Sequence, residues 1–149
     1  MVDCKKVNKI FRVVGIKGGG SFANFGTDVP KLAQQFLTRI DEVENHSGIE
    51  VALFEPKRDT NHLDGHYYVG IIVNETLKEI PVGMDYIETT QAYVTTRGKI
   101  IHIANLHYHL VKWADDTGYK RDLDSHIVET YHPMENGEEE VEIYLPIHI

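Results

Sequence analysis

The sequence predicts an α+β fold of two pseudo-symmetric βαββ modules, which form a curved antiparallel sheet with two helices and a central cleft. The order strand, helix, strand, strand occurs twice, and "ALFEP" (52–56) and "ETYHP" (129–133) occupy the same position in each copy. One βαββ unit buries too little apolar surface to be stable alone, so the copies must share a core. We therefore expect a single domain over 1–149, with a first copy at about 7–75 and a second at about 84–149.

The first copy begins with the Val- and Ile-rich segment "KIFRVVGIKGGG" (9–20), which predicts a strand that ends in a glycine turn. In 27–48, apolar residues recur at three- and four-residue intervals from Val29 to Val43, which predicts an amphipathic helix closed by Gly48. Two strands are then expected, "IEVALFEP" (49–56) and "HYYVGIIVN" (66–74).

The second copy repeats this order. "QAYVTTRG" (91–98) predicts a strand, and 99–118 predicts a helix with Gly118 at its C-terminal cap. The last two strands are expected at "SHIVETYHP" (125–133) and "EVEIYLPIHI" (140–149). Packing the two copies together leaves a groove at the pseudo-two-fold axis, where small-molecule sites tend to form.

Composition limits the partners. The chain has 23 acidic and 15 basic side chains and a net charge of -8, so direct binding to nucleic acid would work against its electrostatic field. The one cysteine excludes a disulfide framework within the chain and fits a reducing cytoplasm. We expect a cytoplasmic protein that does not enter a membrane, since it lacks a bilayer-spanning apolar run and a secretory signal.

Four segments carry a family resemblance: "IPVGMDYIETTQAYVTTRG", "LVKWADDTGYKRD", "IVETYHP" and "EVEIYLPI". With the order of elements, they resemble the GyrI-like small-molecule-binding domain, which is also the effector-binding domain of bacterial AraC-type and MerR-type transcription regulators. The resemblance covers nearly the whole chain and is strongest from Ile80 onward. No helix-turn-helix segment precedes Lys5, so we expect the stand-alone form of the domain.

The resemblance implies a buried glutamate ringed by aromatic residues, which maps to Glu129, and an aromatic of a later strand, which maps to Tyr144. Strand alternation places Ile127, Glu129 and Tyr131 on one face. A buried charge is tolerated where a hydrogen-bond partner or an incoming cation compensates it. We therefore expect Glu129 in the cleft beside aromatic rings; the alternative from the residues alone is an exposed acid.

The other expected ligand-binding residues form the walls of this cleft, where aromatic rings stack on flat ligands and attract cations. The apolar stripe of the second helix favours core packing for Trp113, whereas the resemblance implies a position beside the cleft. Glu142 would equally suit a solvent-facing position. Phe54, at the matching station of the first copy, is interpreted as core. The residues expected to bind ligand together with Glu129 are Tyr68, Tyr93, Trp113, Tyr131, Glu142 and Tyr144.

We expect no metal and no cofactor. His102, His107 and His109 lack the four-residue spacing that stacks two imidazoles on one helical face, while His62 and His66 have it only within a turn. These histidines are interpreted as exposed or hydrogen-bonded.

The leading functional hypothesis is a binding protein for amphipathic or cationic, drug-like effectors, acting in transcription regulation or toxin sequestration. The first alternative is a hydrolase that uses Glu129 and Tyr144, for which the resemblance implies cyclopropane-containing or similar xenobiotics as substrates. The second is a protein-interaction role, such as gyrase inhibition or work with a separate DNA-binding regulator.

Overall fold

The computed structural model describes residues 3–148 and contains the predicted strand, helix, strand, strand order twice. The elements of the first half are β1 (Lys5–Ser21), α1 (Phe25–Leu37), β2 (His46–Phe54) and β3 (Asp64–Val73). Those of the second half are β4 (Asp85–Lys99), α2 (Ile103–Thr117), β5 (Ile127–Pro133) and β6 (Glu139–Ile147).

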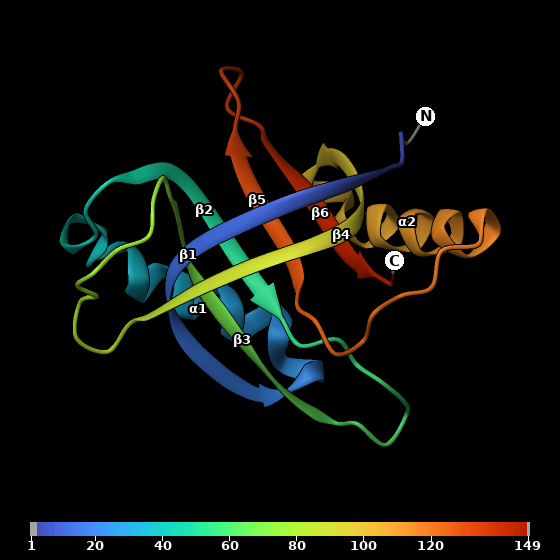
Figure 1. The fold of residues 1–149 in the computed structure, drawn as a ribbon, viewed down its shortest axis with the longest axis horizontal. Helices are drawn as coiled ribbons and strands as arrows, with labels where there is room; N and C mark the ends of the chain where they lie inside the picture. The colour runs from blue at the N-terminus through green and yellow to red at the C-terminus, as the bar shows by residue number, and fades with distance from the viewer. Residues whose placement is uncertain (1–2, 149) are drawn as a thin grey trace.

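The strands form one antiparallel sheet that curves until it closes, in the order β1-β3-β2-β5-β6-β4. The two halves join twice, where β2 pairs with β5 and where β1 pairs with β4. Ala52 lies opposite Glu129, so the first residues of "ALFEP" and "ETYHP" are direct partners across the β2–β5 seam. The pseudo-two-fold axis therefore passes through this seam. In Figure 1, β1 and β4 cross the front of the view, with α1 behind them and α2 to the right.

Three apolar clusters form the core. One fills the inside of the closed sheet and includes Phe11, Leu53, Tyr93, Val128 and Tyr144. A second lies where α1 covers the outer face of β1 and β3, and a third where α2 covers the outer face of β4 and β6. The strands are thus apolar on both faces, and the outer face of the β2–β5 seam lies between the two helices.

Helix α1 is shorter than its apolar pattern predicts. It ends at Leu37, and residues Ile40–Glu42 form a short 3-10 turn. The Arg39 amide donates to the Phe36 carbonyl, and the Thr38 hydroxyl donates to the Gln35 carbonyl, so local bonds tighten and close the last turn. Val43 is nevertheless buried, which explains the continued apolar spacing. Gly48 does not end the helix; it lies in β2 at an irregularity of the β2–β3 register.

The glycine-rich end of the first segment continues β1 instead of forming a turn. Gly18 pairs with Tyr67 of β3, and a Cβ atom at Gly18 would lie 2.6 Å from the Tyr67 ring. Glycine is required here by the close approach of a buried aromatic side chain. The prediction for Gly118 is confirmed: it has a left-handed conformation (φ 94°) and caps α2.

Candidate functional site

A cavity of about 560 Å³ lies over the outer face of the β2–β5 seam. Its walls come from α1, from β2, β3 and β5, from the first residue of β6, and from Ile100 just before α2 and Ile103 at its start. Most of the lining side chains are apolar, among them Phe25, Val29, Phe36, Phe54 and Ile103. The ionisable side chains among the described lining residues are Glu50, Glu129, Tyr131 and Glu139. The cavity is therefore an apolar space with acidic groups on one wall.

Glu129 lines the cavity on this wall and is 7% exposed. Its Oε1 accepts a hydrogen bond from the Tyr131 hydroxyl at 2.7 Å, and its Oε2 lies 2.6 Å from Nε2 of His107 on α2. Burial, and then the negative charge of Glu129, raise the pKa of Tyr131 well above its ordinary value, so this hydroxyl remains a donor. Both carboxylate oxygens are thus satisfied within the protein.

Glu50 and Glu139 form a second acidic region of the cavity. Glu50 lies opposite Tyr131 in the β2–β5 ladder, and Glu139 begins β6. Burial and the neighbouring Glu139 raise the pKa of Glu50. By strand geometry, Glu50 is a diagonal neighbour of Glu129, roughly 7–8 Å away between Cα atoms. A cation in the cavity therefore has more than one carboxylate within reach.

The structure does not bring Tyr144 and Tyr93 to this cavity. Tyr144 lies opposite Val128, one position out of phase with Glu129, and so points into the closed sheet. It packs edge to face on Phe11 (4.9 Å) and Tyr93 (5.8 Å), and its hydroxyl accepts a hydrogen bond from Lys9 at 3.2 Å. Closure of the sheet makes this inner face a packed core.

Three further expected wall residues also lie elsewhere. Tyr68 packs against the inner cluster, 5.9 Å from the His66 ring between ring centroids. Glu142 lies opposite Thr130 and Arg97, on the same face of β6 as Tyr144. Trp113 packs in the cluster under α2, 5.8 Å from Tyr119, which is the core-packing alternative for this residue. Of the seven expected site residues, Glu129 and Tyr131 line the cavity.

The sequence reasoning missed His107, Glu50 and Glu139 as site residues. His107 lies one helical turn after Ile103, so it shares a helix face with a cavity-lining residue, and this spacing is visible in the sequence. Glu50 stands two residues before Ala52, the partner of Glu129, so it follows from strand alternation once the register is known. Phe54, interpreted as core, lines the cavity as well.

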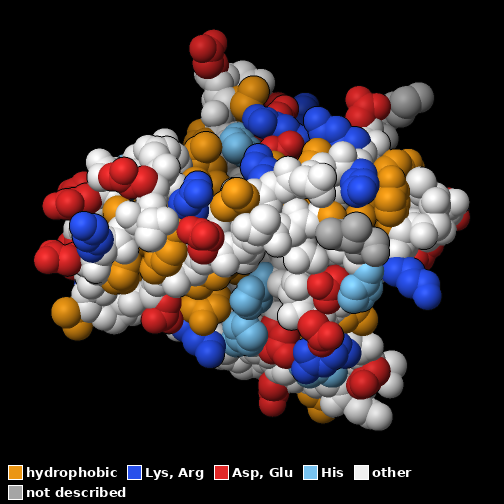
Figure 2. Space-filling model, in the orientation of Figure 1, with side chains coloured by type: hydrophobic (Ala, Val, Ile, Leu, Met, Phe, Trp, Pro, Cys, Tyr) orange, Lys and Arg blue, Asp and Glu red, His pale blue; other side chains and the backbone are white. Residues whose placement is uncertain are grey.

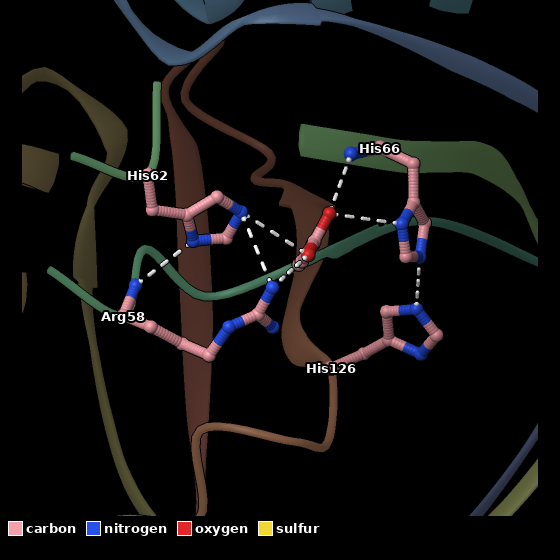
Figure 3. A network of polar contacts seen from close by, with 5 residues as sticks. Arg58, His62, His66 and His126 are labelled. Atoms are coloured by element: carbon pink, nitrogen blue, oxygen red, sulfur yellow. Dashed lines mark hydrogen bonds and ion pairs between the residues drawn. The ribbon is translucent and has the colours of Figure 1, made fainter. Parts of the chain in front are cut away.

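A network of histidines surrounds Glu55 just beyond the end of β2 (Figure 3). Glu55 contacts His66 at 3.1 Å, His62 at 3.3 Å and Arg58 at 3.1 Å, and the His66 amide also donates to it. Burial alone would raise the pKa of Glu55, but the His66 amide and the adjacent histidines and arginine lower it. His66 Nε2 lies 2.8 Å from His126 Nε2, which links β3 to the start of β5.

These polar groups do not form a metal centre. Among residues 3–148, no cluster of three or more His, Cys, Asp or Glu side chains has an arrangement that could hold a metal ion. Within the same range, no helix is both long and apolar enough to cross a membrane. On the face drawn in Figure 2, lysine and arginine side chains are interspersed with acidic ones.

Solved structures share this fold at low sequence identity. SAV2435 bound to tetraphenylphosphonium has a TM-score of 0.70 and 10% identity, over 99% of this chain and 94% of that one. An integron cassette protein from the mobile metagenome of Vibrio cholerae has a TM-score of 0.63 and 13% identity, over 99% and 95%. EcmrR in an EcmrR–DNA complex has a TM-score of 0.66 and 15% identity, over 99% of this chain and 57% of that one.

The likenesses show the fold, and together with a family match over residues 8–147 they define the class of the protein, a GyrI-like effector-binding domain. A family model described as integron-associated effector binding protein, Cass2, matches residues 8–147, and the chain belongs to this family. No curated protein matches the sequence. Small-molecule binding is therefore the general function of this chain.

Proposed function

We propose that the chain binds amphipathic organic cations in the cavity over the β2–β5 seam, with Glu129 as the central acid. The observation that carries this proposal is the composition of the cavity wall, which combines apolar and aromatic side chains with Glu50, Glu129 and Glu139. Burial of ligand rings supplies affinity, and the carboxylates favour positive over negative guests. Lysine and arginine are absent from the described lining residues.

The aromatic part of the wall suits a ligand with rings. Phe25 and Phe54 line the cavity with their ring centroids 6.2 Å apart, and Tyr131 lies on the other side of the seam from Phe54. Faces of aromatic rings attract organic cations as well as stacking on flat groups. SAV2435, which shares the fold, binds tetraphenylphosphonium, a cation with four aromatic rings, and this supports the proposed ligand class.

Two biological uses of such binding remain open to test. In transcription regulation, the bound ligand would alter contact with a DNA-binding partner, and the likeness to EcmrR supports this use. In toxin sequestration, binding alone would protect the cell. Overproduction of the chain in cells exposed to tetraphenylphosphonium should raise tolerance if sequestration is the use, and a ligand-dependent complex in pull-downs should appear if regulation is.

The binding proposal is tested by titrating the protein with tetraphenylphosphonium in a calorimeter, and with triphenylphosphine oxide as a neutral aromatic probe. Glu129→Gln should bind the cation roughly tenfold more weakly and the neutral probe unchanged, since one charge interaction in a partly desolvated site is lost. Glu135→Gln, in the exposed β5–β6 turn, is the matched control and should bind like the unaltered protein. Equal cation affinity in all three proteins would reject the role of Glu129.

A hydrolytic activity is the second candidate, because the Glu129 carboxylate contacts both an imidazole and a phenol. His107 and Tyr131 lie 2.6 Å and 2.7 Å from its two oxygens, an arrangement suited to moving a proton to or from water. The partner tyrosine would be Tyr131 and not Tyr144, which points into the closed sheet. Mass spectrometry after incubation with cyclopropane-containing esters decides: a product of water addition, lost in Glu129→Gln, supports hydrolysis, and unchanged substrate rejects it for this class.

A further inference from the structure

Both oxygens of the Glu129 carboxylate have side-chain partners within the protein. Tyr131 donates to one oxygen, and His107 Nε2 lies 2.6 Å from the other. A contact this short between an imidazole and a carboxylate is typical of a charge-assisted hydrogen bond. A cation that approaches Glu129 therefore meets a carboxylate that already has a partner, and it must compete with that partner.

His107 is placed so that it can exchange a proton with water. Its side chain is 30% exposed, whereas that of Glu129 is 9% exposed. Ile103, one turn earlier on the same face of α2, lines the cavity, so His107 continues the wall from the cavity toward the surface. Histidine is the side chain whose charge ordinarily changes near neutral pH.

We propose that His107 is the built-in counter-ion of Glu129, and that an organic cation takes its place at the carboxylate while the imidazolium proton leaves to solvent. This inference rests on the proposed function, because it requires a cation in the cavity. The charges balance: one positive charge enters the site and one proton leaves it. Cation binding is then coupled to pH, with weaker binding where His107 carries its proton.

Other groups around Glu129 also respond to pH, and the test has to separate them. Tyr131 from β5, Glu50 from β2 and Glu139 from β6 face the same cavity, whereas the lining residues of α1 are uncharged. The pKa of Glu50 is raised by burial and by Glu139, so its protonation weakens cation binding in acid as well. The contribution of His107 is therefore identified by comparing the pH dependence of cation affinity between variants, and not from the unaltered protein alone.

The experiment is calorimetric titration with tetraphenylphosphonium, which has no proton of its own, at about pH 8 and about pH 5.5. Each titration is run in two buffers with different heats of ionisation, which gives the number of protons released. In the unaltered protein, affinity should fall roughly tenfold on acidification, with proton release at acid pH. His107→Gln keeps an N–H donor but cannot carry the charge, so it should release fewer protons than the unaltered protein and should bind the cation more tightly than that protein in acid.

His109→Gln is the matched control, since His109 is an exposed histidine on the same helix, and it should behave like the unaltered protein. Equal proton release and equal pH dependence in the unaltered protein and in His107→Gln would overturn the counter-ion role and leave the binding proposal standing. If His107→Gln lost cation binding at both pH values while its melting temperature stayed unchanged, the proposed displacement of His107 by the cation would likewise be overturned. Absence of tetraphenylphosphonium binding in every protein would overturn both proposals.

Discussion

Tyr131 and Tyr144 belong to neighbouring strands, β5 and β6, and point to opposite faces of the sheet. Tyr131 lies opposite Val141 and donates its hydroxyl to Glu129 in the cavity, whereas Tyr144 lies opposite Val128 and packs inside the closed sheet. The two tyrosines therefore have separable roles, although both lie close to Glu129 in the ladder.

Removal of each hydroxyl should separate ligand binding from stability. Tyr131→Phe leaves one oxygen of Glu129 without its donor, and we expect a several-fold change in affinity for tetraphenylphosphonium. Tyr144→Phe loses the bond to Lys9 and should lower the free energy of unfolding by about 1 kcal/mol, with unchanged affinity. Calorimetric titration and urea unfolding measure the two effects. Loss of cation binding in Tyr144→Phe alone would place the site inside the closed sheet instead.

Glu50→Gln should stabilise the protein while weakening cation binding. The pKa of Glu50 is raised by burial and by Glu139, so the folded state disfavours its negative charge. An acid with a raised folded pKa lowers stability above that pKa and gains stability as the pH falls through it. Glu50→Gln should therefore raise the melting temperature slightly at neutral pH and flatten its dependence on pH. A lower melting temperature would show that the Glu50 charge is compensated in the fold.

The His66–His126 contact should make stability sensitive to acid. Burial, and then the charge of His66, lower the pKa of His126 from the ordinary 6.5. A base with a lowered folded pKa contributes stability that is present above pH 6.5 and is lost as the pH falls through the folded pKa. Protonation of both rings would also place two cations in contact, since the two Nε2 atoms lie 2.8 Å apart.

The measurement is the melting temperature between about pH 7.5 and about pH 5 for the unaltered protein and two variants. The acid-induced decrease should be smaller by about 2–5 °C in His126→Gln, while His109→Gln should match the unaltered protein. Part of the decrease should remain, because burial also lowers the pKa of His132. Identical pH curves for His126→Gln and the unaltered protein would argue against the histidine pair as the origin.

Gly18→Ala should destabilise the fold. The added Cβ would lie 2.6 Å from the ring of Tyr67, which is 4% exposed and fixed in the cluster under α1. We expect a loss of about 1–3 kcal/mol in urea unfolding, as for an overpacked core. Gly26→Ala is the opposite control: nothing lies within 4 Å of its Cβ, and alanine should stabilise α1 by about 0.5–1 kcal/mol. A neutral Gly18→Ala would show that Tyr67 can move aside.

The sequence predicts the element order well, because glycine caps and apolar periods are local signals. The repeat "ALFEP"/"ETYHP" even indicates the seam, since Ala52 and Glu129 prove to be partners. The face on which each aromatic residue lies cannot be predicted in the same way. Alternation places Tyr144 and Leu145 on opposite faces of β6. Both faces are apolar in a closed sheet, so the pattern does not indicate which face borders the cavity.

The helix face of His107 can be predicted from its spacing to Ile103, but its contact with Glu129 cannot. His107 is 22 residues away in the chain, and only the packing of α2 brings its imidazole to the carboxylate. The end of α1 also depends on tertiary contacts, because Arg39 donates to the Val82 carbonyl from the distant β3–β4 connection. Local periodicity therefore predicts the helices and strands, whereas the residues of the candidate site are brought together by long-range contacts.

Because the sheet closes on itself, each of the six strands between residues 5 and 147 has a hydrogen-bonded neighbour on both sides. Along β5, residues 128–131 pair with both β2 and β6, so backbone groups that would recruit a further strand from another molecule are already in use there. At this seam, association with another protein would therefore proceed through side chains and not through an added strand. Each half alone would lose the partners of two strands, because the halves join through the β1–β4 and β2–β5 ladders. If the chain is cut between β3 and β4, the two fragments should therefore reassemble as a complementing pair and not persist independently.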